Sequence, residues 1–148
     1  MIRQIVTSRP ELSQPCETIS SPKELAGLIN DLVHTLDTFN VRAVGLAAPQ
    51  IGVKKQVSLI RCGQDRFFLI NPVLIDHGRD DVVSSEGCLS FPGLSIPVDR
   101  WTEVTVESGV IGRRTTKTYT GYTGIVVQHE MDHLFGKTIF DRKHRRQR

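Results

Sequence analysis

Long apolar stretches are missing from this 148-residue chain. The longest fully apolar runs are short, such as FFLI at positions 67–70, whereas a helix needs about 18 to 20 apolar residues to span a bilayer. The first ten residues, MIRQIVTSRP, also lack the apolar core of a secretory signal. We therefore expect neither a membrane segment nor a membrane partner.

Cysteine is scarce as well. The three cysteines, Cys16, Cys62 and Cys88, are odd in number and widely spaced, so they do not form the paired framework of a small secreted domain. This usage favours the reducing cytoplasm. A chain of this length forms about one domain and can bury a core without a metal as a structural staple, so a metal site here need not be structural.

A strong charge of one sign is missing from most of the chain. Residues 141–148, DRKHRRQR, contribute +4 to a net charge of +3, so the other 140 residues sum to −1. A near-neutral body does not favour wrapping of nucleic acid, although the basic end could touch phosphates. We divide the chain into one catalytic domain, residues 1–141, and a basic C-terminal tail, residues 142–148.

The apolar periodicity predicts one helix near each end of the chain. In SSPKELAGLINDLVHTLDTF, Ser20 or Ser21 is the expected cap, Pro22 lies in the first turn, and apolar residues follow at helical spacing. The second helix should run from about Tyr122 to Phe135. Gly136 stands where a left-handed C-terminal cap would lie.

The segments between these helices are rich in β-branched and aromatic residues and are broken by Gly, Asn and Pro. The segments VSLIRC, FFLINPVLID, WTEVTVESGV and TTKTYTGY predict short, mostly antiparallel strands. The order helix, strands, helix favours an α+β fold over a doubly wound sheet. There is no internal repeat and no low-complexity linker.

The second predicted helix carries a polar cluster in the segment GIVVQHEMDHLFGK, residues 124–137. His129 and His133 are four residues apart and share one helix face, whereas Glu130 is rotated by about 100° from His129. Two imidazoles aimed at one point beside an acid are typical of a metal site with an adjacent base. The alternative is a pair of satisfied core histidines with Glu130 bound to an arginine, so a second signal is required.

The segment EGCLS, residues 86–90, supplies that signal. A hydrolytic metal site uses three protein ligands and keeps one position for water, and Cys88 offers a thiolate as the third ligand. A lone cysteine is more often an inert buried thiol, but Cys88 lies in a Gly-containing polar turn. A weaker signal is AVGLAAPQIG, residues 43–52, where small residues let a peptide approach the backbone and Gln50 offers an amide donor.

Together these segments resemble the three motifs of the peptide deformylase family, GxGxAAxQ, EGCLS and HExxDH, in that order. Two motifs match in full, and Ala43 replaces the leading glycine of the first, which narrows the expected pocket near Val44. The resemblance covers nearly the whole chain. The sequence stops soon after Phe140, without the long C-terminal helix of many bacterial members, and in this it is similar to the short forms encoded by bacteriophages.

The resemblance implies an α+β fold with antiparallel β-sheets packed around a central metal-binding helix. It also implies removal of the N-formyl group from the N-terminal formylmethionine of nascent polypeptides, with release of formate. Cys88, His129 and His133 would hold one Fe²⁺ per chain. Donor chemistry alone would suggest zinc, and Zn²⁺, Ni²⁺ or Co²⁺ could substitute.

The family motifs also assign roles to neighbouring residues. Glu130 would take the proton of the attacking water and return it to the leaving nitrogen. The side-chain amide of Gln50 and the backbone N–H of Leu89 would stabilise the oxyanion. Gly45 and Gly87 would offer backbone hydrogen bonds to an extended peptide. The expected pocket for the methionine side chain is formed by Val44, Tyr122, Ile125 and Val126.

Glu86 and Arg100 could form a buried ion pair, shared with Asp132, that stiffens this site. A surface pair is the alternative. The expected partners are formyl-methionyl nascent peptides and, through the basic tail, the ribosome. We expect a monomer.

Three other functions stay open at this point. A zinc metallopeptidase of the HExxH type usually takes its third ligand after the second histidine, where only residues 136–148 remain and His144 lies in the charged tail. A cysteine hydrolase would use Cys88 as its nucleophile and would keep full activity after chelation. A non-enzymatic, metal-stabilised module that binds the ribosome would tolerate the loss of Glu130.

Overall fold

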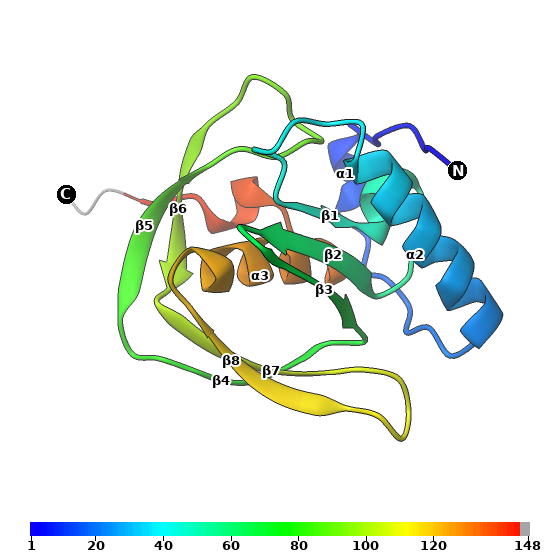
Figure 1. The fold of residues 1–148 in the computed structure, drawn as a ribbon. Coiled ribbons are helices and arrows are strands. Elements are labelled where there is room, and N and C mark those ends of the chain that lie inside the picture. The colour runs from blue at the N-terminus through cyan, green and yellow to red at the C-terminus, as the bar shows by residue number, and fades with distance from the viewer. Residues whose placement is uncertain (146–148) are drawn as a thin grey trace.

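The computed structural model describes residues 1–145, and its elements form an α+β fold, as expected (Figure 1). Arg146, Gln147 and Arg148, the end of the predicted basic tail, lie outside the described residues. The helices are α1 (Arg9–Leu12), α2 (Pro22–Leu36), η1 (Ala48–Ile51), α3 (Gly121–Leu134) and η2 (Ile139–Arg142). The strands are β1 (Gly45–Ala47), β2 (Val57–Cys62), β3 (Asp65–Ile70), β4 (Val73–His77), β5 (Asp81–Glu86), β6 (Ile96–Trp101), β7 (Glu103–Ser108) and β8 (Thr115–Thr120).

Local sequence explains the start of α2 and the face that it buries. The side chain of Ser21 accepts a hydrogen bond from the backbone N–H of Glu24 at 3.3 Å, and Pro22 lies in the first turn, as predicted. Apolar residues then recur every four positions, which places them on one helix face. The most buried of these are Leu28, Leu32 and Leu36, which pack in a core with residues of β1, β2 and η1.

Antiparallel strands surround α3 in three small sheets (Figure 1). Their orders are β1-β2-β3, β4-β7-β8 and β5-β6, and all strand pairs found within residues 1–145 are antiparallel. The four predicted strand segments correspond to β2, β3, β4, β7 and β8. The sequence analysis did not predict α1, β1, β5 or β6, and the last three of these border the site.

The central helix α3 begins and ends one residue earlier than predicted. It closes at Gly136, which has a φ of 74°. The N–H of Gly136 donates to the carbonyl of His133 at 3.3 Å, and the N–H of Lys137 donates to the carbonyl of Asp132 at 2.8 Å, which is the predicted left-handed cap. A Cβ on Gly136 would also lie 2.8 Å from the carbonyl oxygen of Ser13, so the C-terminal end of α3 packs tightly against the N-terminal segment.

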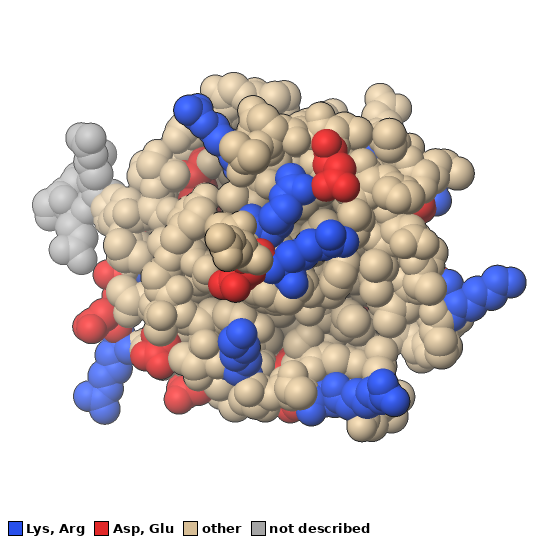
Figure 2. Space-filling view, in the orientation of Figure 1, with Lys and Arg blue, Asp and Glu red and all other residues tan. Residues whose placement is uncertain are grey.

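The surface carries charges of both signs. On the face shown in Figure 2, Lys and Arg are interspersed with Asp and Glu rather than gathered in one field. No helix within residues 1–145 has the length and apolarity that crossing a membrane requires.

Candidate active site

Two chain segments bring Cys88, His129 and His133 together. Cys88 lies in the connection between β5 and β6, and both histidines lie on α3. The Sγ of Cys88 is 3.5 Å from the Nε2 of His133. One possible ligand atom from each of the three residues lies within 4.8 Å of the other two. The structure therefore places the three residues of the predicted ligand set in one cluster.

The spacing of this cluster fits a metal ion. Zinc binds sulfur at about 2.3 Å and imidazole nitrogen at about 2.0 Å, so tetrahedral angles separate the two donors by about 3.5 Å. That is the observed separation of Cys88 Sγ and His133 Nε2. His133 is 1% exposed, and within residues 1–145 its Nδ1 has no hydrogen-bond partner. Within the described residues, the polar contact of the His133 ring is therefore the one from its Nε2 to Cys88 Sγ.

Glu86 orients the other imidazole from behind. The Nδ1 of His129 lies 2.8 Å from Oε1 of Glu86, so its Nε2 is left to face the cluster. Arg100 donates to both Glu86 oxygens at 2.8 Å and to Asp132 at 2.6 Å. The Arg100 side chain is 3% exposed. The predicted buried ion pair of Glu86 and Arg100, shared with Asp132, is confirmed, and the surface-pair alternative is wrong.

This network shifts the pKa values of the site. Burial raises the pKa of Glu86, but the hydrogen bonds and charges of Arg100 and His129 outweigh it and lower that pKa to about 2. Burial lowers the pKa of His129, yet its hydrogen bonds to Cys88 and Glu86 raise it overall to about 10. Burial and the cations His129 and Arg100 lower the pKa of His133 well below its usual value. His133 is therefore held in the neutral form that binds metals, whereas a bound ion would have to displace the proton that His129 holds.

Glu130 lies beside the cluster rather than within it. Its Oε1 is 3.8 Å from the Nε2 of His129, and its side chain is 4% exposed. Its Oε2 is buried without a hydrogen-bond partner within residues 1–145. Burial raises the pKa of Glu130 to about 7, because the opposite charge of His129 offsets only part of the effect. Such a carboxyl is suited to accept and return a proton near neutral pH.

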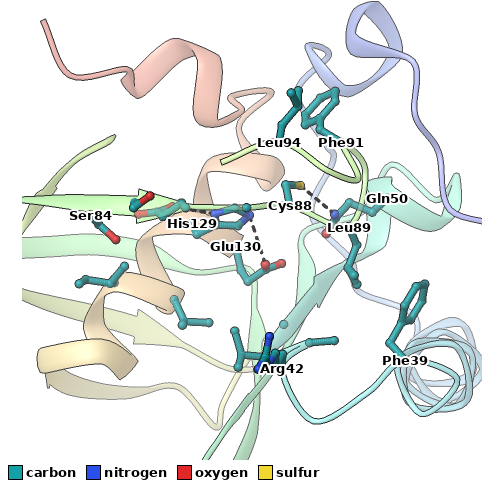
Figure 3. A pocket seen from close by; sticks show the side chains of 18 of the residues that line it. Phe39, Arg42, Gln50, Ser84, Cys88, Leu89, Phe91, Leu94, His129 and Glu130 are labelled. Atoms are coloured by element: carbon teal, nitrogen blue, oxygen red, sulfur yellow. Dashed lines mark hydrogen bonds and ion pairs between the residues drawn. The ribbon is translucent and has the colours of Figure 1, made fainter. Parts of the chain in front are cut away.

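Gln50 reaches the same cluster from η1. Its Nε2 donates to Ser90 Oγ at 3.1 Å and lies 3.5 Å from Cys88 Sγ, while its Oε1 accepts from the N–H of Ala47 at 2.9 Å. The side-chain amide is thereby fixed with its donor end toward the ligand cluster (Figure 3). Leu89, the next residue after Cys88, lines the same pocket.

One pocket of about 370 Å³ lies over these groups (Figure 3). His133 does not line it and contacts Cys88 from the protein interior. Tyr122 is 61% exposed, so it borders the mouth of the pocket. The residues predicted to bind substrate all line the pocket: Val44, Gly45, Gly87, Tyr122, Ile125 and Val126.

Sequence reasoning missed several lining residues. Phe39 and Arg42 come from the turn between α2 and β1, and Ser84 comes from β5. The loop that follows Cys88 adds Phe91 and Leu94. All five are within four residues of the segments AVGLAAPQIG and EGCLS. Proximity to those segments is the signal that could have found them.

The comparisons with known proteins agree with this geometry. The family model of polypeptide deformylase matches residues 2–148. The peptide deformylase of Aquifex aeolicus (strain VF5) is 40% identical over 151 residues, which covers 96% of this chain and 88% of that protein. The crystal structure of peptide deformylase from Thermotoga maritima has a TM-score of 0.91 at 29% identity and covers 98% of this chain and 99% of its own. A peptide deformylase from Synechococcus elongatus in complex with actinonin has a TM-score of 0.87 at 33% identity, over 98% of this chain and 80% of its own.

Proposed function

The chain belongs to the polypeptide deformylase family and is a metal-dependent deformylase, and we propose that Cys88, His129 and His133 bind its metal. The observation that carries this proposal is the 3.5 Å separation of Cys88 Sγ and His133 Nε2, with His129 completing the cluster. The zinc metallopeptidase alternative is not favoured. The third donor of the cluster precedes the two histidines in the chain, whereas that class usually takes it from after them.

Fe²⁺ is the proposed metal, one ion per chain, with Zn²⁺, Ni²⁺ or Co²⁺ able to occupy the same site. A donor set of one thiolate and two imidazoles suits these late first-row ions. When bound, such an ion acts as a Lewis acid and lowers the pKa of a coordinated water.

The chain's own groups handle the proton and the developing charge. Glu130 takes the proton of the attacking water on its unpaired carboxyl oxygen and returns it to the leaving nitrogen. The Nε2 of Gln50 and the backbone N–H of Leu89 donate to the oxyanion of the tetrahedral intermediate. The fixed orientation of the Gln50 amide supports its role, because a donor that is already aimed needs no reorganisation during the reaction.

The peptide substrate lies in the pocket next to these groups. The free edge of β1 and the chain after β5 both border the pocket, and Gly45 and Gly87 there offer backbone hydrogen bonds to an extended chain. The methionine side chain contacts Val44, Ile125 and Val126, with Tyr122 at the mouth. The formyl group then faces Glu130 and the ligand cluster.

We propose that the protein acts on nascent formylated chains in the cytoplasm of a bacterium, or of a bacterial host, as a monomer that visits the ribosome. Residues 1–141 form the catalytic domain in this proposal, and residues 142–148 form a basic segment that touches ribosomal RNA phosphates. The described part of that segment is attached to the body. Arg142 donates to Asp132 at 3.2 and 3.3 Å, and the N–H of His144 donates to the carbonyl of Pro97 at 2.8 Å.

The test is formate release from a formyl-Met peptide, with and without a chelator, followed by anaerobic addition of Fe²⁺ or Ni²⁺. We expect chelation to abolish the release and either ion to restore it. Activity that survives complete removal of metal would instead support a cysteine hydrolase with Cys88 as nucleophile.

A further inference from the structure

An arginine stands at the mouth of the active-site pocket. Arg42 is exposed and lines the pocket together with Val44 and Gly45. Its backbone N–H donates to Oδ1 of Asn40 at 2.9 Å, which holds the turn that precedes β1. In the view of Figure 3, Arg42 lies on the far side of Glu130 from Cys88. The cation is therefore near the path of the peptide and away from the reacting atoms.

The charge of Arg42 is not used inside the protein. Within residues 1–145, its guanidinium has no ion pair and no hydrogen bond, whereas the nearby Arg61 is held by Asp37 at 2.7 Å. Among the described residues that line this pocket, Arg42 is the only Lys or Arg. The two carboxylates that line the pocket do not form an ion pair with Arg42, because Glu86 is bound to Arg100 and Glu130 is buried beside His129.

The position of Arg42 along the chain indicates which part of a substrate it meets. The backbone at Gly45 lies against the side chain of Glu130, since a Cβ there would be 2.9 Å from Glu130 Cδ. Arg42 precedes Gly45 by three residues and lies in the turn before β1, so at most about 10 Å of backbone separates the two. A peptide that extends along this edge from a formyl group at Glu130 reaches Arg42 with about its second to fourth residue.

We propose that Arg42 makes the enzyme selective for formyl-methionyl peptides with Asp or Glu at the second to fourth position, an inference that rests on the proposed function. A guanidinium binds a carboxylate through paired hydrogen bonds and repels an ammonium group. Because the pair is exposed to water, we expect a preference of about two- to fivefold for Glu over Gln. The contact is the same in the bound substrate and in the transition state, so it changes KM more than kcat.

The experiment compares matched peptides with metal-loaded enzyme. Formyl-Met-Xaa-Ala-Ala-amide, formyl-Met-Ala-Xaa-Ala-amide and formyl-Met-Ala-Ala-Xaa-amide are made with Xaa as Glu, Gln or Lys, and kcat and KM are measured at low salt. We expect Glu to exceed Gln and Gln to exceed Lys in kcat/KM. Arg42→Gln should remove this order and Arg42→Glu should reverse it. High salt, about 0.5 M, should reduce the differences in kcat/KM among the peptides for the wild type, because exposed charges are screened.

The matched control is Arg113→Glu. This residue is exposed in the turn between β7 and β8 and does not line the pocket, and the substitution changes the net charge by the same amount. Arg113→Glu should keep the wild-type order. Equal KM values for the Glu, Gln and Lys peptides would overturn the proposal, and so would an equal change in order from Arg113→Glu. Failure of the loaded wild type to hydrolyse any of the peptides would instead overturn the proposed function.

Discussion

Gly45 lies in direct contact with Glu130. A Cβ built on Gly45 would be 2.9 Å from Cγ and Cδ of the glutamate and 3.0 Å from its Oε1. Real Cβ atoms do not approach other atoms so closely, and the glutamate is 3% exposed. The backbone of β1 therefore packs directly against the Glu130 carboxyl, and only glycine at position 45 leaves space for that carboxyl.

Gly45→Ala should displace the Glu130 carboxyl and slow turnover while the metal stays bound. A misplacement of about 1 Å in a catalytic group costs about 10²-fold in rate. The checks are kcat and metal content on the same sample. Gly27→Ala is the control, because Gly27 lies on α2 with nothing within 4 Å of an added Cβ. A Gly45→Ala enzyme with wild-type kcat would show that Glu130 does not depend on this contact.

Glu130→Gln should keep the metal and lose activity. Glutamine has nearly the same shape but cannot accept and return the proton, so we expect a loss of about 10²- to 10⁴-fold in kcat. Metal content and kcat must come from one preparation. If the metal is lost together with the activity, Glu130 is a ligand and its assignment as general base is wrong.

Cys88→Ala should lose most of the bound metal and most of the activity, because two imidazoles alone hold these ions less tightly than two imidazoles and a thiolate. Metal per chain after dialysis is the measurement. Cys62→Ala is the control, since Cys62 is buried in β2 and lies outside the ligand cluster. About one metal per Cys88→Ala chain, with activity intact, would remove Cys88 from the site.

Arg100→Met should lower the free energy of unfolding by about 3–5 kcal/mol, because it leaves the carboxylates of Glu86 and Asp132 without their shared cation. Urea denaturation of the loaded enzyme measures this loss. Lys55→Met is the control, since the Lys55–Glu17 pair is largely exposed on its acidic side and should cost no more than about 1 kcal/mol. Similar small losses in both variants would mean that the buried network does not stabilise the fold.

Much of the scaffold of the site could be predicted from local sequence. Capping at Ser21, the helical spacing of the two histidines and the cap at Gly136 each depend on residues within a few positions of one another, so a short window contains the whole signal. The grouping of Cys88, His129 and His133 could be predicted for a related reason. Each of its segments carries an unusual combination of residue types in few positions.

The elements around the pocket could not be predicted in this way. β1 has three residues, all buried, and so shows no alternation. β5 and β6 pair across a connection of nine residues, and β6 contains Pro97, which weakens a strand signal. Arg42 and Phe39 carry no periodic signal, and only the folded turn before β1 brings them to the pocket. Such placements depend on contacts between segments that are distant in sequence.

The basic end of the chain gives the last prediction. Arg142 is already bound to Asp132. The other Lys and Arg residues of this segment of the sequence are Lys143, Arg145, Arg146 and Arg148. Replacing these four with Gln should leave formate release from a free formyl-peptide unchanged, because every proposed catalytic group lies upstream. Co-sedimentation with ribosomes at low salt should weaken, and its dependence on salt should become less steep, because the variant neutralises fewer RNA phosphates. Arg142→Gln alone is the control and should change ribosome binding less. Equal co-sedimentation of the wild type and the four-site variant across a salt series would leave this segment without a part in docking.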